Sequence, residues 1–264
     1  MGNACVLITG GSKGIGLYLA QAFAKRNYNL YLLSLPNEDL HAVAAELEKS
    51  YAIKTWQQEI DLTTNDSTKD VLDFIATNNL DIKVLVNNAG IGHFGQFDKT
   101  DELFYKQLLN INVVTPTLLT RAVLPNMHKL PKAYILNVAS MGGFFNMPFK
   151  VVYSASKAYV LNFSRSLNME LKTSNIFVCS LCPSGVDTFP HSKEHLEKVG
   201  GLVAKGRQSA TQVAEFAVDQ MFKGKRIIVP GRINRMLWRV SRMLPEYWVT
   251  SIFGWKLRPL YEEE

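Results

Sequence analysis

Short apolar runs rich in β-branched residues alternate with longer amphipathic stretches along most of this chain. This alternation is typical of repeated β-α-β units, in which helices cover a buried parallel sheet. It predicts strands at residues 4–9, 29–34, 54–60, 82–87, 133–139, 176–181 and 226–229. It predicts helices at residues 14–26, 39–49, 65–77, 102–127, 151–173 and 211–222. We therefore expect an α/β fold with a doubly wound parallel sheet of about seven strands.

Two segments depart from this alternation. Residues 188–206 are the most polar and least regular part of the chain, which predicts a lid inserted over a site. Residues 231–264 follow the last predicted strand and keep helical spacing, which predicts a C-terminal helical extension. No linker divides the chain, and its 264 residues with 47% hydrophobic content suffice for one large core. We expect a single domain over residues 1–264.

The cysteines and the start of the chain bear on its location. Three cysteines fit a reducing cytoplasm better than a disulfide framework, and we expect Cys179 and Cys182 to pack on opposite faces of the core. The apolar run within residues 1–9 is too short for a signal peptide or a membrane span. We therefore expect the fold to begin there, and we expect a cytoplasmic location.

The net charge of +6 is concentrated near the C-terminus. Residues 223–258 hold nine Lys or Arg and a single acid, Glu246, so the rest of the chain is mildly acidic. This distribution does not predict a general nucleic-acid surface. Within the extension, one helical face carries Arg232, Arg235, Arg239 and Arg242, and another carries Met236, Leu237, Val240, Met243 and Leu244. Such a helix can lie on an anionic membrane, pack across a dimer, or cover a substrate mouth.

A glycine-rich segment joins the first predicted strand to the first predicted helix. Residues 9–16 read Thr-Gly-Gly-Ser-Lys-Gly-Ile-Gly. Glycines at such a junction let the backbone approach a pyrophosphate at the helix N-terminus. The spacing G-x-x-x-G-x-G differs from the G-x-G-x-x-G of most dinucleotide folds.

With this loop the chain resembles the short-chain dehydrogenase/reductase family, and the resemblance extends over at least residues 5–188. It implies a Rossmann-type NAD(P)-binding domain that works as a homodimer or homotetramer. For the C-terminal extension, resemblance to family members that carry a similar tail favours the dimer or lid role over the membrane role. The glycine spacing argues against the sugar-nucleotide epimerases, which share part of the later motif.

The resemblance carries over to further nucleotide contacts. Asp61 and Leu62 follow the third strand, where a carboxylate is expected near the adenine, and Asn87-Asn88-Ala89-Gly90 follow the fourth. Residues 182–188 are similar to the family segment that covers the nicotinamide, although Ser184 stands where a glycine is usual. The expected cofactor contacts are Gly10, Ser12, Lys13, Gly14, Ile15, Gly16, Ser34, Asp61, Leu62, Asn88, Ala89, Gly90, Tyr153, Lys157, Pro183, Val186 and Thr188.

The end of the second strand bears on the choice of nicotinamide cofactor. NAD-dependent enzymes place an acid there on the ribose 2′-hydroxyl, whereas this chain has Ser34-Leu35-Pro36-Asn37. Lys13 stands at a position where similar proteins carry a basic residue for NADP. The usual Arg is replaced by Leu35, Glu38 and Asp39 are close by, and Lys13 can equally be a solvated loop lysine. We expect NADP(H) to be favoured over NAD(H).

Tyr153 and Lys157 lie four residues apart, on one face of a predicted helix. A hydride delivered to a carbonyl carbon leaves an alkoxide that needs a proton, which a phenol can supply. A neighbouring ammonium and an oxidised nicotinamide favour the phenolate. Ser140 ends the fifth strand and can polarise the carbonyl oxygen. The resemblance adds Asn112, which holds a water in a proton relay, so Asn112, Ser140, Tyr153 and Lys157 form the expected catalytic tetrad.

The substrate is suggested only by the neighbours of this tetrad. Residues 141–149 form an aromatic loop that predicts a bulky apolar carbonyl substrate such as a 3-oxoacyl or steroid compound, although half of these side chains can pack in the core. His191 and His195 lack a third ligand, so we expect no metal. Two alternatives stay open: a non-catalytic dinucleotide-sensing protein, and an epimerase or dehydratase.

Overall fold

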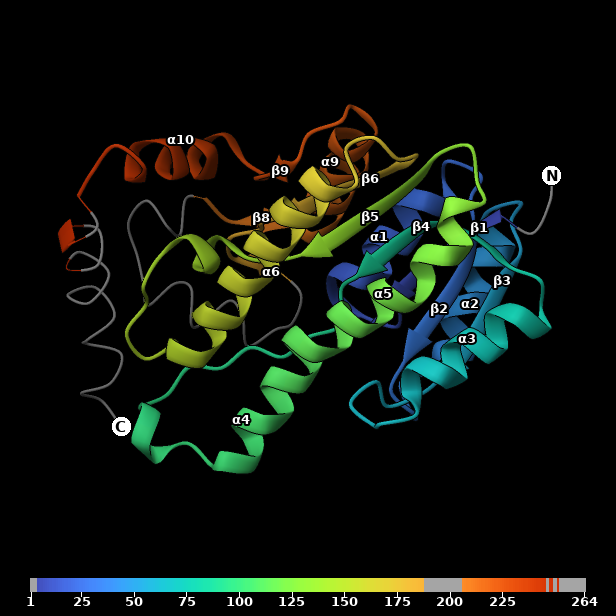
Figure 1. Cartoon of the computed structure of the whole chain (residues 1–264), viewed down its shortest axis with the longest axis horizontal. Helices are drawn as coiled ribbons and strands as arrows, with labels where there is room; N and C mark the ends of the chain where they lie inside the picture. The colour runs from blue at the N-terminus through green and yellow to red at the C-terminus, as the bar shows by residue number, and fades with distance from the viewer. Residues whose placement is uncertain (1–3, 188–205, 246, 249–250, 252–264) are drawn as a thin grey trace.

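A seven-stranded sheet forms the centre of the computed structural model, which describes residues 4–187, 206–245, 247, 248 and 251 (Figure 1). Its strand order is β3-β2-β1-β4-β5-β6-β9, and every neighbouring pair is parallel. The strands are β1 (Ala4–Thr9), β2 (Asn29–Ser34), β3 (Thr55–Glu59), β4 (Asp81–Asn87), β5 (Ala133–Val138), β6 (Ile176–Leu181) and β9 (Ile227–Ile228). The predicted doubly wound sheet is confirmed.

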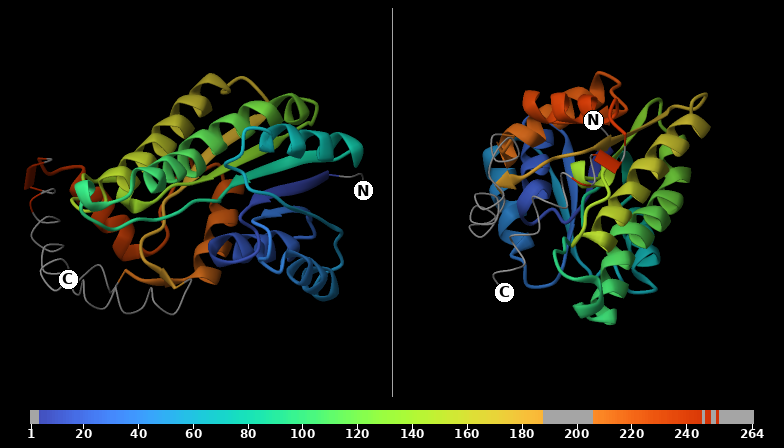
Figure 2. Two further views of the ribbon diagram at one scale, coloured as in Figure 1. Left: turned by 90° about the horizontal axis from the view of Figure 1, so that it is seen from below. Right: turned by 90° about the vertical axis from the view of Figure 1, so that its left-hand side faces the viewer.

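Helices cover both faces of this sheet (Figure 2). One layer holds α1 (Gly14–Ala24), α2 (Leu40–Ser50) and α9 (Ala210–Phe222); the other holds α3 (Ser67–Thr77), α5 (Thr115–His128) and α6 (Val151–Glu170). Successive strand residues point to opposite faces. Thus Val6 and Ile8 of β1 pack in the first layer, and Cys5 and Leu7 pack in the second. Burial on both faces explains why central strands such as β1 read as nearly continuous apolar runs.

The strand order places a crevice beside β1. From β1 the chain proceeds outward to β2 and β3, then crosses back to β4 on the other side of β1. The connections after β1 and β4 therefore leave in opposite directions at the carboxyl ends of the strands. Ligands of open α/β sheets bind at such a switch point.

The predicted helix at residues 102–127 is interrupted. It consists of α4 (Glu102–Leu109), a π-helical turn (Asn110–Val114) and α5, and the backbone N–H of Thr115 donates to the carbonyl of Asn110. Pro116 has no N–H, so it cannot donate the α-helical bond to the carbonyl of Asn112. The α-helical ladder therefore breaks at this proline. Asn112 lies inside the turn that results.

Smaller elements flank the crevice. The strands β7 (Val186–Asp187) and β8 (Gln208–Ser209) form a two-stranded parallel sheet that the apolar pattern does not predict, because two residues carry no periodicity. A 3-10 turn (Met141–Phe144) follows β5, another (Phe97–Lys99) precedes α4, and α10 (Arg232–Ser241) follows β9. Of the predicted lid, only Gly206 is among the described residues, and the predicted extension is described no further than residue 251.

Candidate active site

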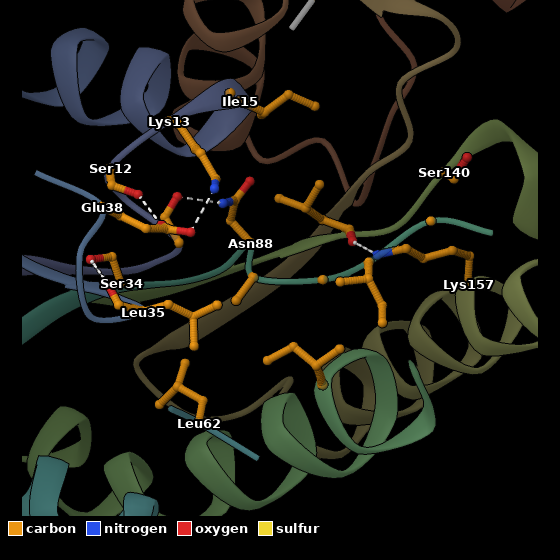
Figure 3. Close-up of a pocket in the computed structure, with 18 of the residues that line it drawn as sticks. Ser12, Lys13, Ile15, Ser34, Leu35, Glu38, Leu62, Asn88, Ser140 and Lys157 are labelled. Carbon is orange, nitrogen blue, oxygen red and sulfur yellow. Dashed lines mark hydrogen bonds and ion pairs between the residues drawn. The ribbon is translucent and has the colours of Figure 1, made fainter. Parts of the chain in front are cut away.

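A cavity of about 580 Å³ opens at the carboxyl ends of the strands (Figure 3). Most of the predicted site residues line it: Gly10, Ser12, Lys13, Gly14, Ile15, Ser34, Asp61, Leu62, Asn88, Ala89, Gly90, Ser140, Tyr153, Lys157, Pro183 and Val186. Gly16 and Asn112 lie behind its wall, and Thr188 lies outside the described residues. The fold thus brings the segments that follow β1, β2, β3, β4, β5 and β6 to one cavity.

The glycine loop adopts a backbone that side chains would disturb. Gly10 and Gly14 have φ of +66° and +56°, in the left-handed region that favours glycine. A Cβ atom on Gly16 would lie 1.9 Å from the carbonyl oxygen of Gly10. The N-terminus of α1 begins at Gly14, so its first amides face the cavity without intrahelical partners. This cradle fits the pyrophosphate of a dinucleotide.

Hydrogen bonds fix the loop after β4 against the glycine loop. The side-chain amide of Asn88 donates to the carbonyls of Thr9 (2.9 Å) and Gly10 (3.1 Å). The hydroxyl of Thr9 accepts from the backbone N–H groups of Asn88 and Ala89, both at 2.9 Å. The Asn-Asn-Ala-Gly segment therefore holds the two central loops of the crevice together while Asn88, Ala89 and Gly90 also line the cavity.

Glu38 lies in the cavity wall between Ser12 and Lys13, a contact that the sequence did not reveal. Its carboxylate is 2.6 Å from the Lys13 ammonium and accepts a 2.5 Å hydrogen bond from Ser12. Burial alone would raise the pKa of Glu38, but the Lys13 and Ser12 contacts outweigh it and lower the pKa. In the sequence, the only indication of this contact is that Glu38 follows β2 closely. Whether it reaches Lys13 depends on the path of that loop.

Asp61 lines the same part of the cavity. One of its carboxylate oxygens accepts hydrogen bonds from the backbone N–H (2.9 Å) and hydroxyl (2.7 Å) of Thr63. These local bonds orient the side chain on the loop that follows β3. Leu62 lies beside it in the wall, opposite Leu35 of the β2 loop (Figure 3). The two leucines provide apolar contact for a flat ring such as adenine.

Tyr153, Lys157 and Ser140 meet at the other end of the cavity. Tyr153 and Lys157 belong to the first two turns of α6, and Ser140 follows β5. Burial raises the pKa of the Tyr153 phenol, and a hydrogen bond with Ser140 opposes this rise. The chain's own groups thus favour the neutral phenol, the form that can donate a proton. This differs from the expectation from the sequence, in which a neighbouring ammonium and an oxidised nicotinamide favour the phenolate.

Lys157 is a buried cation. Its ammonium donates a 3.0 Å hydrogen bond to the carbonyl of Val138 and lies 5.9 Å from the centre of the Tyr153 ring. Burial lowers its pKa to about 8. A lysine with that pKa changes its protonation state near neutral pH, so it can exchange protons as well as hold a positive charge.

Asn112 acts from behind the cavity wall. Its side chain accepts from the backbone N–H of Ile91 and donates to the Ile91 carbonyl, both at 3.0 Å, and also donates to the Ser156 hydroxyl (3.1 Å). It therefore joins the loop after β4 to α6. Both amide N–H donors of its side chain are used in these contacts. Its backbone carbonyl is the group that Pro116 leaves without an α-helical donor.

The aromatic loop divides between core and surface. Phe144 and Phe145 pack against a buried cluster that includes Val160 and Leu161, and Phe144 also contacts Trp238 of α10, with ring centres 5.6 Å apart. Phe149 has a φ of +63° and its ring lies 6.3 Å from that of Phe94. The core alternative therefore holds for the first two aromatic residues.

Lys150 is a second cation near Tyr153 that sequence reasoning missed. It precedes α6, and its ammonium lies 6.0 Å from the Tyr153 ring centre and 5.5 Å from that of Phe94. Burial lowers its pKa. Within the described part of the chain no carboxylate pairs with it. In the sequence, only its spacing of three residues from Tyr153 indicates that Lys150 lies near the phenol, and such spacing is too common to predict a site.

The segment after β6 closes the cavity beside Ser140. Pro183 and Val186 line the wall, and the Pro183 carbonyl accepts a 2.9 Å hydrogen bond from the backbone N–H of Met141. Cys182 just before them is buried, as is Cys179, and both are free thiols. Among the described residues no group of three His, Cys, Asp or Glu side chains could hold a metal ion, and His191 and His195 lie outside them.

Comparison with known proteins identifies the family. The short chain dehydrogenase family model matches residues 4–198. Very-long-chain 3-oxoacyl-CoA reductase of Mus musculus is 36% identical over 189 residues, which cover 69% of this chain and 59% of the mouse protein. The chain thus spans about three fifths of the length of this curated relative.

Solved structures of dehydrogenases resemble this chain as well. The short-chain dehydrogenase from Sphingobium yanoikuyae in complex with NADPH is 27% identical with a TM-score of 0.78, covering 91% of this chain and 92% of that one. The bulky-bulky ketone specific alcohol dehydrogenase from Comamonas testosteroni is 25% identical with a TM-score of 0.76, covering 90% and 91%. The resemblance predicted from the motifs is confirmed: the chain belongs to the short-chain dehydrogenase/reductase family of NAD(P)-dependent oxidoreductases.

Proposed function

We propose that this protein uses NADP(H) to interconvert a ketone or aldehyde and an alcohol, and that its substrate is bulky and apolar. The observation that carries this proposal is the convergence of Ser140, Tyr153 and Lys157 on the cavity that the glycine loop also lines. A sensing role requires no buried phenol and ammonium beside a Ser hydroxyl. Sugar-nucleotide epimerases share the Tyr and Lys, and it is the G-x-x-x-G-x-G spacing of residues 10–16 that argues against that alternative.

The proposed roles follow from these contacts. A bound nicotinamide supplies or accepts the hydride. Ser140 and Tyr153 orient and polarise the carbonyl oxygen, and the neutral Tyr153 phenol donates the proton that the resulting alkoxide needs. Lys157 then restores the proton on Tyr153, because its pKa of about 8 permits exchange near neutral pH. Asn112 positions this relay through the loop at Ile91 and through Ser156 of α6.

The choice of NADP(H) rests on the far end of the cavity. Lys13 is 58% exposed there and can reach a 2′-phosphate, while residues 34–37 at the end of β2 include no acid that would bind a ribose 2′-hydroxyl. Glu38 stands close to both, but its charge is compensated by Lys13 and Ser12. A phosphate can exchange with Glu38 for these two donors. The NADPH complex of the Sphingobium relative supports the same choice.

The substrate class rests on the loop after β5 and on the relatives. Phe149, Phe94 and Tyr153 gather around Lys150 at the catalytic end, which provides apolar surface beside the proposed carbonyl position. The mouse relative is named for very-long-chain 3-oxoacyl-CoA, and the Comamonas relative for bulky ketones. Both names support a large apolar substrate for this chain.

We also propose a homodimer or homotetramer. Three exposed apolar side chains lie along the π-helical turn and α5 or just before them, at Leu109, Val114 and Leu118. Tyr159 and Met169 are exposed on the neighbouring α6. An apolar stripe shared by two adjacent helices can pair with its own copy across a two-fold axis.

A substrate panel tests the proposal. Purified protein is mixed with NADPH or NADH and with long-chain 3-oxoacyl-CoA esters, bulky aryl ketones, steroid ketones and small ketones, and cofactor oxidation is followed by absorbance. The proposal predicts higher kcat/KM with NADPH and with the bulky substrates. Turnover of small ketones alone would contradict the substrate class, and preference for NADH would contradict the cofactor.

A further inference from the structure

The outward face of α10 combines arginines with apolar side chains. Arg232, Met236, Arg239 and Val240 fall on one side of α10, which has 3.6 residues per turn, and Met243 follows two residues after the end of the helix. All five are exposed. The helical spacing predicts arginines on one face and apolar residues on another, whereas the exposed face of α10 holds both kinds of side chain.

The opposite face attaches α10 to the body of the protein. Asn234 is 1% exposed and donates to the carbonyls of Gly206 (2.8 Å) and Pro230 (3.1 Å). Trp238 packs on Phe144 and joins the cluster around Val160. Arg235 donates to the carbonyl of Val229 (3.1 Å) and lies over the ring of Phe216. The helix is therefore held in place without its outward apolar residues.

Those apolar residues are highly accessible and continue past the helix. Met236 is 50% exposed, Val240 47% and Met243 84%. Leu244 (41%), Tyr247 (79%) and Trp248 (63%), which follow α10 in the chain, are exposed as well. Surfaces that contact only water rarely expose so many large apolar side chains, and such exposure marks an interaction site.

The charge of this surface has one sign. Residues 231–248 contain four arginines and one acid, Glu246. No carboxylate of the described residues forms an ion pair with Arg232, Arg239 or Arg242. These guanidinium groups are therefore available to an external anion.

We propose that the outward face of α10, together with Leu244, Tyr247 and Trp248, lies on the surface of an anionic lipid bilayer. Apolar side chains enter the boundary between headgroups and acyl chains, aromatic residues prefer that boundary, and arginines pair with lipid phosphates. None of the described helices is both long and apolar enough to cross a membrane, so the contact is peripheral. The inference does not depend on the proposed activity.

A second copy of the chain fits this surface less well. In a two-fold dimer the same patch meets itself, so the arginines of one copy would face those of the other. The patch offers no described carboxylate to relieve that repulsion. A nucleic acid would use the arginines but would leave Met236, Val240 and Met243 without apolar contact. Anionic lipid satisfies both kinds of side chain.

Vesicle flotation tests the proposal. The full chain is mixed with phosphatidylcholine vesicles, with or without phosphatidylserine, and the fraction that floats gives a partition coefficient. We expect binding to the phosphatidylserine vesicles that weakens as salt is added. Arg232→Gln with Arg239→Gln should reduce the partition coefficient by roughly 30-fold, because each basic residue near such a surface contributes about a factor of five. Met236→Asp with Val240→Asp should abolish flotation.

Controls separate this contact from general charge and from misfolding. Lys49→Gln with Lys129→Gln removes the same charge from exposed positions on α2 and directly after α5, and should leave flotation unchanged. Circular dichroism shows whether each variant is folded. Failure of the wild-type chain to float with phosphatidylserine vesicles at low salt would overturn the proposal. So would a self-association, measured by sedimentation, that Met236→Asp disrupts while flotation persists unchanged.

Discussion

The two ends of the cavity hold their lysines in opposite ways (Figure 3). At the nucleotide end, Lys13 is 58% exposed and pairs with Glu38 at 2.6 Å. At the catalytic end, Lys157 is 6% exposed, has no described carboxylate partner, and donates to a backbone carbonyl. An exposed lysine that pairs with a carboxylate can exchange one anion for another. A buried, unpaired lysine has a lowered pKa and can pass a proton.

Lys157→Met should give the largest effect. The substitution preserves the length of the side chain but removes both the charge and the proton, so kcat for ketone reduction should fall by roughly 10²–10⁴-fold. Initial rates with saturating NADPH measure this loss. Lys25→Met, an exposed lysine far from the cavity, is the matched control and should retain full activity. A kcat within twofold of wild type would show that the catalytic end does not need its buried cation.

Gly16→Ala should disturb the nucleotide end most strongly. The new methyl would meet the Gly10 carbonyl at 1.9 Å, so the loop must move. Such overpacking costs about 1–3 kcal/mol, and the dissociation constant for NADPH should rise by about tenfold or more. Gly11→Ala is the control, since its methyl would first meet the flexible end of Leu32 at 3.1 Å. Equal NADPH titration curves for the two variants would argue against the tight cradle.

Lys157 should also lower the free energy of unfolding at neutral pH. Its pKa is about 8 in the folded protein and near 10.5 when unfolded, so the unfolded chain binds more protons between these values. The free energy of unfolding therefore rises with pH from about 8 to 10.5. Lys157→Met should be more stable than wild type at pH 7 by about 1–3 kcal/mol and should lack this contribution to the pH dependence. Urea unfolding at pH 7 and pH 9.5 measures both, and parallel pH curves for the two proteins would refute the assignment.

Glu38→Gln should produce the smallest effect. Removing the carboxylate leaves Lys13 unpaired and takes a negative charge away from the proposed 2′-phosphate position. Because exposed ion pairs contribute less than about 1 kcal/mol, the affinity for NADPH should rise by about two- to fivefold, with little change for NADH. Fluorescence titration with both nucleotides measures this. Glu46→Gln, an exposed residue of α2, serves as control. Tighter binding of NADH alone would mean that Glu38 opposes no phosphate.

The sequence predicted those parts of the fold that depend on local composition. Strands such as β1 and β5 are buried on both faces, so most of their residues are apolar, and Gly10 and Gly14 adopt positive φ. Both requirements leave a visible pattern. The pairing of Tyr153 with Lys157 could be expected from spacing, because α6 places them on adjacent turns. Asn112 could be expected only from the family resemblance.

The sequence did not predict features that depend on contacts between distant segments. Pro116 signals a possible break within residues 102–127, but it is equally compatible with the first turn of a helix, so it does not specify a π-helical turn around Asn112. The contacts of Glu38 with Ser12 and of Lys150 with Phe94 depend on loop paths. The outward placement of Met236 and Val240 depends on Asn234 and Trp238 occupying the inward side of α10.

Tyr153→Phe tests the central claim most directly. It removes only the hydroxyl that hydrogen-bonds with Ser140, so packing and nucleotide binding should persist. In a single turnover with NADPH and a bulky ketone, we predict a rate about 10²–10⁴-fold below wild type and an unchanged dissociation constant for NADPH. A single-turnover rate equal to that of wild type would contradict the assignment of Tyr153 as the proton donor.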